Sequence, residues 1–358
     1  MLHLRIVAPT ELAARALELL CTADSVCNVI HLPDAARQPA GDVILCDVAR
    51  EDASVILSDL RELGIPVEGS IAIEVIDTQL SQYAEEAKRA ARGSPSDAVV
   101  WEEVEARTSE TAELSASYVA FMVLAALIAS VGIFLDSPIL IVGAMVVGPE
   151  FGPIAGFCVA VVQRRGALAW RSFVALAVAF PIAIALTLLV VLAFKATGVT
   201  PDTFTEQDHE LSSVIASPDF LAFFVAFCAG IAGVLSLTTA KSGALIGVLI
   251  SVTTIPAAAN VAVAAGYGDW SACVGSLGQL ALNLAAILLA GTGTLYAQRL
   301  LYRRRRQAHL DDPERLAAGL PAALSGPGRA GSASPAAAAV RRSAPARPRS
   351  RSSSAPDR

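Results

Sequence analysis

Six apolar segments between residues 117 and 297 constrain the fold more than any other feature of the sequence. Each is about 20 residues long or longer, which is the length that an α-helix needs to cross the hydrocarbon core of a bilayer. Across the chain, 54% of residues are hydrophobic and only 17% are charged. The sequence therefore predicts an α-helical integral membrane protein with six spans, at residues 117–135, 138–162, 167–193, 220–240, 243–265 and 271–297.

The segments before and after the apolar region differ in the sign of their net charge. Residues 1–116 hold 21 acidic and 9 basic side chains, whereas residues 299–358 hold 4 acidic and 13 basic ones. We interpret residues 81–116 as an acidic helical connector, solvated rather than docked on anionic lipid. Residues 299–358 are rich in Ala, Pro, Ser and Arg and have little to bury, which is typical of a basic disordered tail. The six-span domain then covers residues 117–298.

The basic residues near the spans predict the orientation in the membrane. With the N-terminus inside, nine Lys and Arg residues flank the spans on the cytoplasmic side, while the outer loops hold only Lys195. The opening "MLHLRIVAPTELAARALELL" lacks the basic start and the sustained apolar run of a cleavable signal peptide. We therefore expect a multi-pass protein of the cell membrane with both termini in the cytoplasm.

Residues 1–80 show a different periodicity. Strand candidates "LHLRIVAP", "SVCNVIHL", "GDVILCDV" and "GSIAIEVIDT" alternate with two amphipathic helices in the order β-α-β-β-α-β, which predicts a small ferredoxin-like α+β domain. The six cysteines form no C-x-x-C and the four histidines are scattered, so no metal site or cofactor is expected. There is no phosphate loop and no nucleophile–base pair, so we do not expect an enzyme.

The stretch "GAMVVGPEFGP", residues 143–153, combines glycines, prolines and a glutamate inside the second span. Glu150 lies 12 residues after Pro138 and 12 before Val162, or about 18 Å from either end of a straight helix. The span is therefore predicted to be broken near the bilayer midplane. The residues expected to form the break are Gly148, Pro149, Gly152 and Pro153.

The two halves of the apolar region are similar when shifted by 103 residues. Phe121 then falls on Phe224, and Pro153 falls on Pro256 without a gap. Each half has three spans, so the second half enters from the opposite side and the pattern predicts a 3+3 inverted repeat. Such repeats with interrupted spans indicate a binding site where the broken helices meet. We expect the breaks in the second and fifth spans, the latter at Pro256.

Two interpretations of Glu150 follow. Because a charged carboxylate in a membrane is costly, it either binds a cation or proton, or stays protonated and hydrogen-bonds the carbonyl groups freed at the break. The residues expected to share its site are Thr253, which the repeat matches to Glu150, Thr254, Asn260 and Asn283. For the two asparagines, hydrogen bonds that join neighbouring helices are an equally good explanation.

The segment "SYVAFMVLAALIASVGIFLDSPILIVGAMVVGPEFGPIAG" resembles the bacterial and archaeal membrane family known as domain of unknown function 389. The residues that carry the resemblance are Asp136–Pro138, Gly143–Met145, Pro149 and Pro153. It extends over roughly residues 1–300 and implies an integral membrane protein whose activity is unknown. Many members have an apolar residue at the position of Glu150, so the resemblance implies that this carboxylate is a specialisation of a subgroup.

These features favour a transporter or channel-like permease for a small ion or solute, with its central site at the broken helices and with gating by residues 1–80. The second hypothesis is a membrane-anchored sensor or scaffold that transports nothing and binds a ligand or partner through the ferredoxin-like domain. We expect the lipid bilayer and a second copy of the chain as partners, and no specific nucleic acid.

Overall fold

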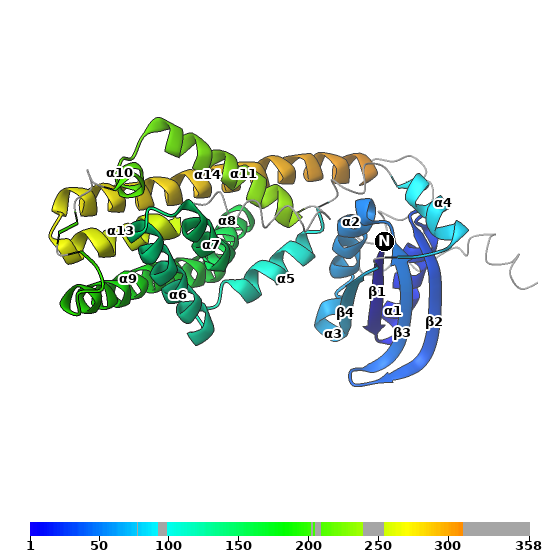
Figure 1. The fold of residues 1–358 in the computed structure, drawn as a ribbon. Helices are drawn as coiled ribbons and strands as arrows, with labels where there is room; N and C mark the ends of the chain where they lie inside the picture. The colour runs from blue at the N-terminus through cyan, green and yellow to red at the C-terminus, as the bar shows by residue number, and fades with distance from the viewer. Residues whose placement is uncertain (77, 92–98, 202, 205–208, 239–253, 311–358) are drawn as a thin grey trace, which may run out of the picture. The chain divides into compact units, whose positions relative to one another are not determined.

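The structure is a computed structural model that describes residues 1–76, 78–91, 99–201, 203–204, 209–238 and 254–310. Its N-terminal part holds a four-stranded antiparallel sheet with the strand order β2-β3-β1-β4. The strands are β1 (Leu2–Ala8), β2 (Val26–Arg37), β3 (Ala40–Val48) and β4 (Ser70–Val75). Figure 1 shows β2 and β3 as a long hairpin at one side of this sheet.

Buried and more exposed residues alternate along β1, and the buried ones mark the face of the sheet that the helices cover. Leu2, Leu4 and Ile6 are fully buried, and α1 (Thr10–Thr22) packs on the sheet through its apolar side. After β3 the chain forms α2 (Arg50–Glu62) and the short α3 (Ile65–Glu68), which precede β4. Gly64 allows this arrangement because its φ of 84° is in the left-handed region. The N-terminal part is thus a small antiparallel sheet with helices.

The connector forms two helices, α4 (Gln82–Ala90) and α5 (Trp101–Thr111). α4 begins at Ser81, whose side chain accepts a hydrogen bond from the backbone N–H of Ala84. α5 is less solvated than the sequence predicts. Trp101 and Val104 are buried, in one cluster with apolar residues of α8 and α14.

Four helices are long and apolar enough to cross a membrane. They are α6 (Ala116–Phe134), α9 (Gly166–Ala196), α11 (Phe220–Thr238) and α14 (Trp270–Leu310). The helices α7 (Pro138–Val147) and α8 (Phe151–Gln163) pass the same test as a pair, with a bend of 52° between them, so the described spans are four, or five with this pair. Of the predicted span 243–265, residues 243–253 lie outside the described part, and the remainder belongs to α13 (Thr254–Tyr267).

Helix α13 lies at the centre of the helical part. All residues from Thr254 to Ala264 are buried, and α13 packs against α6, α7 and α9. A helix that is buried on every side must be surrounded by other helices. Five of its eleven buried residues are alanine, and α6 buries three alanines, a serine and a glycine; such small side chains let neighbouring helices approach closely.

Two polar regions of the sequence contain more helix than predicted. α14 continues through the start of the predicted disordered tail as far as Leu310, and residues 311–358 lie outside the described part. Between the predicted spans 167–193 and 220–240, where the sequence analysis assigned no helix, a short helix α10 (Glu210–Ile215) forms. It packs against α13.

Candidate functional site

The break between α7 and α8 follows from three consecutive residues. Gly148 ends α7, and its N–H donates to Ala144 O at 3.1 Å. Pro149 has no N–H to continue the ladder, and Glu150 is the N-cap residue of α8. Pro153 stands in the first turn of α8, where a backbone N–H has no partner within the helix in any case. The same local sequence therefore ends one helix and begins the next.

The side chain of Glu150 is buried, with 1% of its surface exposed. Its Oε1 accepts a hydrogen bond of 2.8 Å from Thr254 Oγ1 on α13. Its Oε2 is buried and has no hydrogen-bond partner among the residues that the structure describes. The carboxyl group thus joins two helices through one oxygen and keeps the second as an open acceptor.

Gly148 provides the space for this carboxyl group. A Cβ atom at Gly148 would overlap with Glu150 Oε2 and would lie 2.8 Å from Ile255 Cγ1. Real Cβ atoms do not approach other atoms so closely, so any larger residue must displace the side chains of Glu150 and Ile255. The sequence predicted Gly148 only as part of the helix break; its contact with Glu150 is an additional role.

The electrostatic surroundings of Glu150 are mixed. Its position at the start of α8 exposes the carboxyl group to the positive end of that helix, which stabilises a negative charge. Tyr118 on α6 lies close enough to interact electrostatically with Glu150, and its buried hydroxyl has no hydrogen-bond partner among the described residues. Phe151 and Ile255 beside them are buried in the apolar core. Tyr118 was not singled out from the sequence, since a tyrosine near the end of a span is also a common interfacial anchor.

The depth of Glu150 in the membrane cannot be taken from a residue count. The distance of about 18 Å from either end assumes one straight helix, whereas α7 and α8 are bent by 52°. Tyr118, its neighbour, lies in the first turn of α6. The structure therefore removes the basis for placing the carboxylate at equal distance from both ends.

Asn260 belongs to a separate cluster. Its Nδ2 donates to Ser276 Oγ at 2.8 Å and to Ser212 O at 3.3 Å, and its Oδ1 accepts from Ser212 Oγ at 2.9 Å. All three residues are buried, and they join α10, α13 and α14. Asn260 is six residues after Thr254, about 9 Å further along the helix. It is therefore bonded to its own neighbours rather than to Glu150.

The other predicted site residues are also apart from Glu150 in their bonding. Asn283 is buried in α14, where its Oδ1 accepts a hydrogen bond of 3.0 Å from Gln279 Nε2. Pro256 is buried near the start of α13, and Gly152 lies in the first turn of α8 beside Pro153. Thr253, the predicted counterpart of Glu150, lies outside the described residues. Of the five residues predicted to bind an ion, the structure brings together Glu150 and Thr254.

The donor set at Glu150 limits the chemistry of the site. One carboxyl group and one threonine hydroxyl provide few oxygen ligands, whereas a calcium ion takes six to eight. Within the described ranges, no three His, Cys, Asp or Glu side chains are grouped so that they could hold a metal ion. The arrangement suits a proton or a weakly held monovalent cation.

Comparison with known proteins confirms the family resemblance of the sequence. Residues 145–289 match the family described as "Domain of unknown function (DUF389)". An uncharacterised protein of Methanocaldococcus jannaschii is 27% identical over 196 residues, which cover 53% of this chain and 58% of that protein. The chain thus matches little more than half the length of this relative. No solved structure matches the chain.

Proposed function

We propose that this chain is a membrane transporter or channel-like permease in which a small cation or a proton binds at Glu150, between α7, α8 and α13. The observation that carries the proposal is the buried carboxyl group with one oxygen bonded to Thr254 and the other without a partner among the described residues. A buried acceptor left unpaired costs about 1–3 kcal/mol. A bound proton or cation at Oε2 would remove this cost.

The position of the group supports transport rather than a purely structural role. Glu150 lies where one span is interrupted between α7 and α8, and interrupted helices in a membrane occur where the backbone lines a cavity or is covered by protein. Thr254 contributes from α13, which is separated by more than a hundred residues and is buried on every side. A change in the occupancy of Glu150 would therefore act directly on the hydrogen bond that joins the break between α7 and α8 to α13.

We further propose the six-span, 3+3 inverted repeat as the architecture. Helices α6 and α11 begin at Ala116 and Phe220, which are 104 residues apart. Helices α9 and α14 begin at Gly166 and Trp270, also 104 residues apart. These spacings agree with the shift of 103 residues in the sequence. Both termini would lie in the cytoplasm, and assembly as a homo-oligomer stays a prediction.

The N-terminal part is proposed as a ferredoxin-like gate that acts through α5. Its strand order β2-β3-β1-β4 supports that fold. Arg50 at the start of α2 forms a salt bridge of 2.8 Å with Glu103 on α5. Glu105, half a turn later, pairs with Arg165 directly after α8. One short helix thus contacts both the N-terminal part and the helix that begins at Glu150.

Ion flux through the purified full-length chain in liposomes tests the proposal. We expect Glu150→Gln, which keeps the shape and removes the charge, to lower proton or cation flux at least about tenfold, because this change removes the carboxyl group that would bind the proton or cation. Thr254→Val, which removes the hydroxyl at nearly constant volume, should lower the flux by about threefold to fivefold through the loss of one hydrogen bond.

Glu110→Gln is the matched control, since Glu110 is an exposed glutamate on α5. It should leave the flux unchanged, and size-exclusion profiles should be the same for all variants. Flux that is insensitive to Glu150→Gln would refute the site. Absence of any flux in the unmodified chain, with ligand binding to the N-terminal part, would favour the sensor or scaffold.

A further inference from the structure

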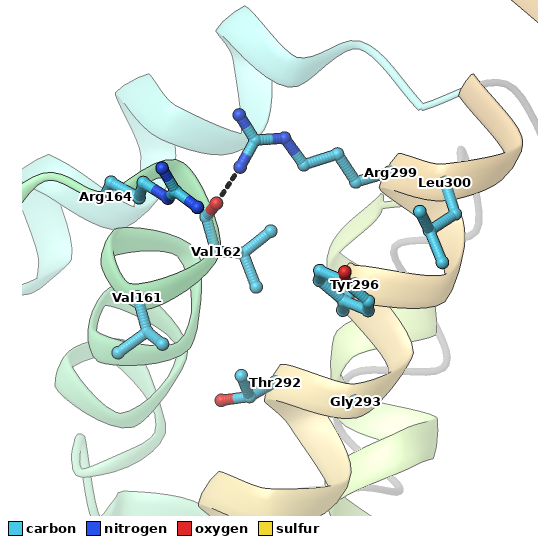
Figure 2. A pocket seen from close by; sticks show the side chains of 8 residues that line it. All are labelled: Val161, Val162, Arg164, Thr292, Gly293, Tyr296, Arg299 and Leu300. Carbon is cyan, nitrogen blue, oxygen red and sulfur yellow. Dashed lines mark hydrogen bonds between the residues drawn. The ribbon is translucent and has the colours of Figure 1, made fainter. Parts of the chain in front are cut away.

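A second candidate site lies at the other end of α8. A pocket of about 410 Å³ opens between the C-terminal end of α8 and the part of α14 near Arg299 (Figure 2). It is separate from Glu150, because the two lie at opposite ends of the 13-residue helix α8. The side chains that matter for its chemistry are Val161, Arg164, Thr292, Tyr296, Arg299 and Leu300.

The polar side of the pocket is cationic. Arg299 donates a hydrogen bond to the carbonyl oxygen of Val162 in the last turn of α8, and Arg164 follows as the C-cap residue with a φ of 60°. Figure 2 shows the two guanidinium groups on the same side of the pocket, near this carbonyl group. Two positive charges at one rim favour an anionic ligand.

Neighbouring arginines differ from Arg164 in their pairing. Arg165 forms a salt bridge with Glu105, and Arg171 forms one with Glu113. In the part of the chain that the structure describes, no acidic side chain pairs with Arg164, which is exposed. The charge of Arg164 is therefore available to a ligand from outside the fold.

The pocket also has exposed apolar side chains on both of its helices. Val161 and Leu300 are each 44% exposed, and Tyr296 is 57% exposed. These residues belong to helices that can cross a membrane, at the end where arginines replace the apolar run. Such a place lies at the level of the lipid headgroups, where Tyr and Arg side chains are favoured. The pocket thus presents a cationic rim beside an apolar wall.

We infer that this pocket binds the headgroup of an anionic phospholipid, with the phosphate group between Arg164 and Arg299 and an acyl chain along Val161 and Leu300. Basic pockets between membrane helices at the headgroup level bind anionic lipids in this way. The charge selects the phosphate, and the exposed apolar wall selects a lipid over a free phosphate ion. A bound lipid would connect the end of α8 to α14.

Binding of fluorescent phosphatidylglycerol to the full-length chain in detergent micelles tests the inference. We expect Arg164→Gln to weaken binding about fivefold, the effect of one basic side chain near an anionic headgroup. Arg171→Gln is the matched control because Arg171 is an arginine that already has a partner, Glu113. The basic C-terminal residues are the same in both variants, so their nonspecific contribution cancels.

A second variant blocks the space without changing the charge. A Cβ atom at Gly293 meets nothing within 4 Å, so Gly293→Trp can be accommodated and should fill the pocket and weaken binding. Gly143→Trp is its control, since Gly143 is equally open but lies on α7. Equal affinity of Arg164→Gln and Arg171→Gln, equal binding of phosphatidylcholine, or displacement of the lipid by millimolar inorganic phosphate would overturn the inference.

Discussion

Two buried polar clusters in the helical part differ in how completely their hydrogen bonds are made. In the cluster of Ser212, Asn260 and Ser276, the amide of Asn260 uses both its nitrogen and its oxygen, and three helices are joined. In the pair of Glu150 and Thr254, one carboxylate oxygen is bonded and the other is not. A satisfied cluster stabilises packing, whereas a buried open acceptor needs another explanation. The two clusters therefore differ in how completely their polar atoms are paired, and Glu150 is the carboxyl group of the helical part with an open oxygen among the described residues.

The largest effect is expected from Gly148→Ala. The added methyl group would overlap with Glu150 Oε2 and press on Ile255, so the carboxyl group must leave its position. We expect ion flux in liposomes to fall at least about tenfold, with a loss of about 1–3 kcal/mol of stability. Gly143→Ala, on the same helix with open space around its Cβ, should change neither quantity by a comparable amount. Normal flux in Gly148→Ala would show that the position of the carboxyl group is irrelevant.

A smaller and different effect is expected from Asn260→Leu. The change removes three hydrogen bonds, each about 0.6 kcal/mol in a membrane protein, so unfolding in detergent should require about 2 kcal/mol less free energy. The flux per folded molecule should stay unchanged, because Asn260 has no bond to Glu150. Ser276→Ala, which removes one of the three bonds, should show a proportionally smaller loss. A selective loss of flux in folded Asn260→Leu would place Asn260 in the transport site after all.

The smallest effect concerns a half-buried acid outside the apolar helices, Glu102. Burial raises the pKa of Glu102 on α5 above its ordinary value of 4.5, although Arg61 at 3.3 Å and Ser54 partly offset this. An acid whose pKa is higher in the folded state binds more protons when folded, so its contribution to stability falls as pH rises above about 4.5. Glu102→Gln should flatten this part of the pH dependence of unfolding. A slope identical to that of the unmodified chain would show that Glu102 has no share in it.

Several features of the fold could be predicted because they depend on neighbouring residues in the chain. The consecutive Gly148 and Pro149 disfavour a continuous helix through their local backbone properties, so the break in the second span could be predicted from the sequence. The alternation in "LHLRIVAP" likewise predicted β1, because a half-buried strand needs this period. The extension of α14 to Leu310 was missed, because composition alone suggested disorder where the helix in fact continues.

The partners in the candidate site could not be predicted in the same way. Thr253 and Thr254 are adjacent and chemically identical, and both were predicted at the site; Thr254 bonds to Glu150, and Thr253 lies outside the described residues. Which of two successive residues faces a neighbour depends on the rotation of the helix about its axis, about 100° per residue. A helix that is buried on every side has no polar face, so its sequence does not indicate which of its residues points toward a given neighbour. The lipid pocket was missed for a related reason, since Arg164 and Arg299 are far apart in the chain.

The sequence by itself determined that this chain has long apolar helices, that one of them is interrupted, and that an acid stands at the interruption. These are properties of local composition and of backbone geometry. Only the tertiary structure decided that the acid meets Thr254, that Gly148 leaves room for it, and that Asn260 is satisfied elsewhere. Those outcomes depend on how separate helices pack, and packing is set by the whole interior rather than by any one segment.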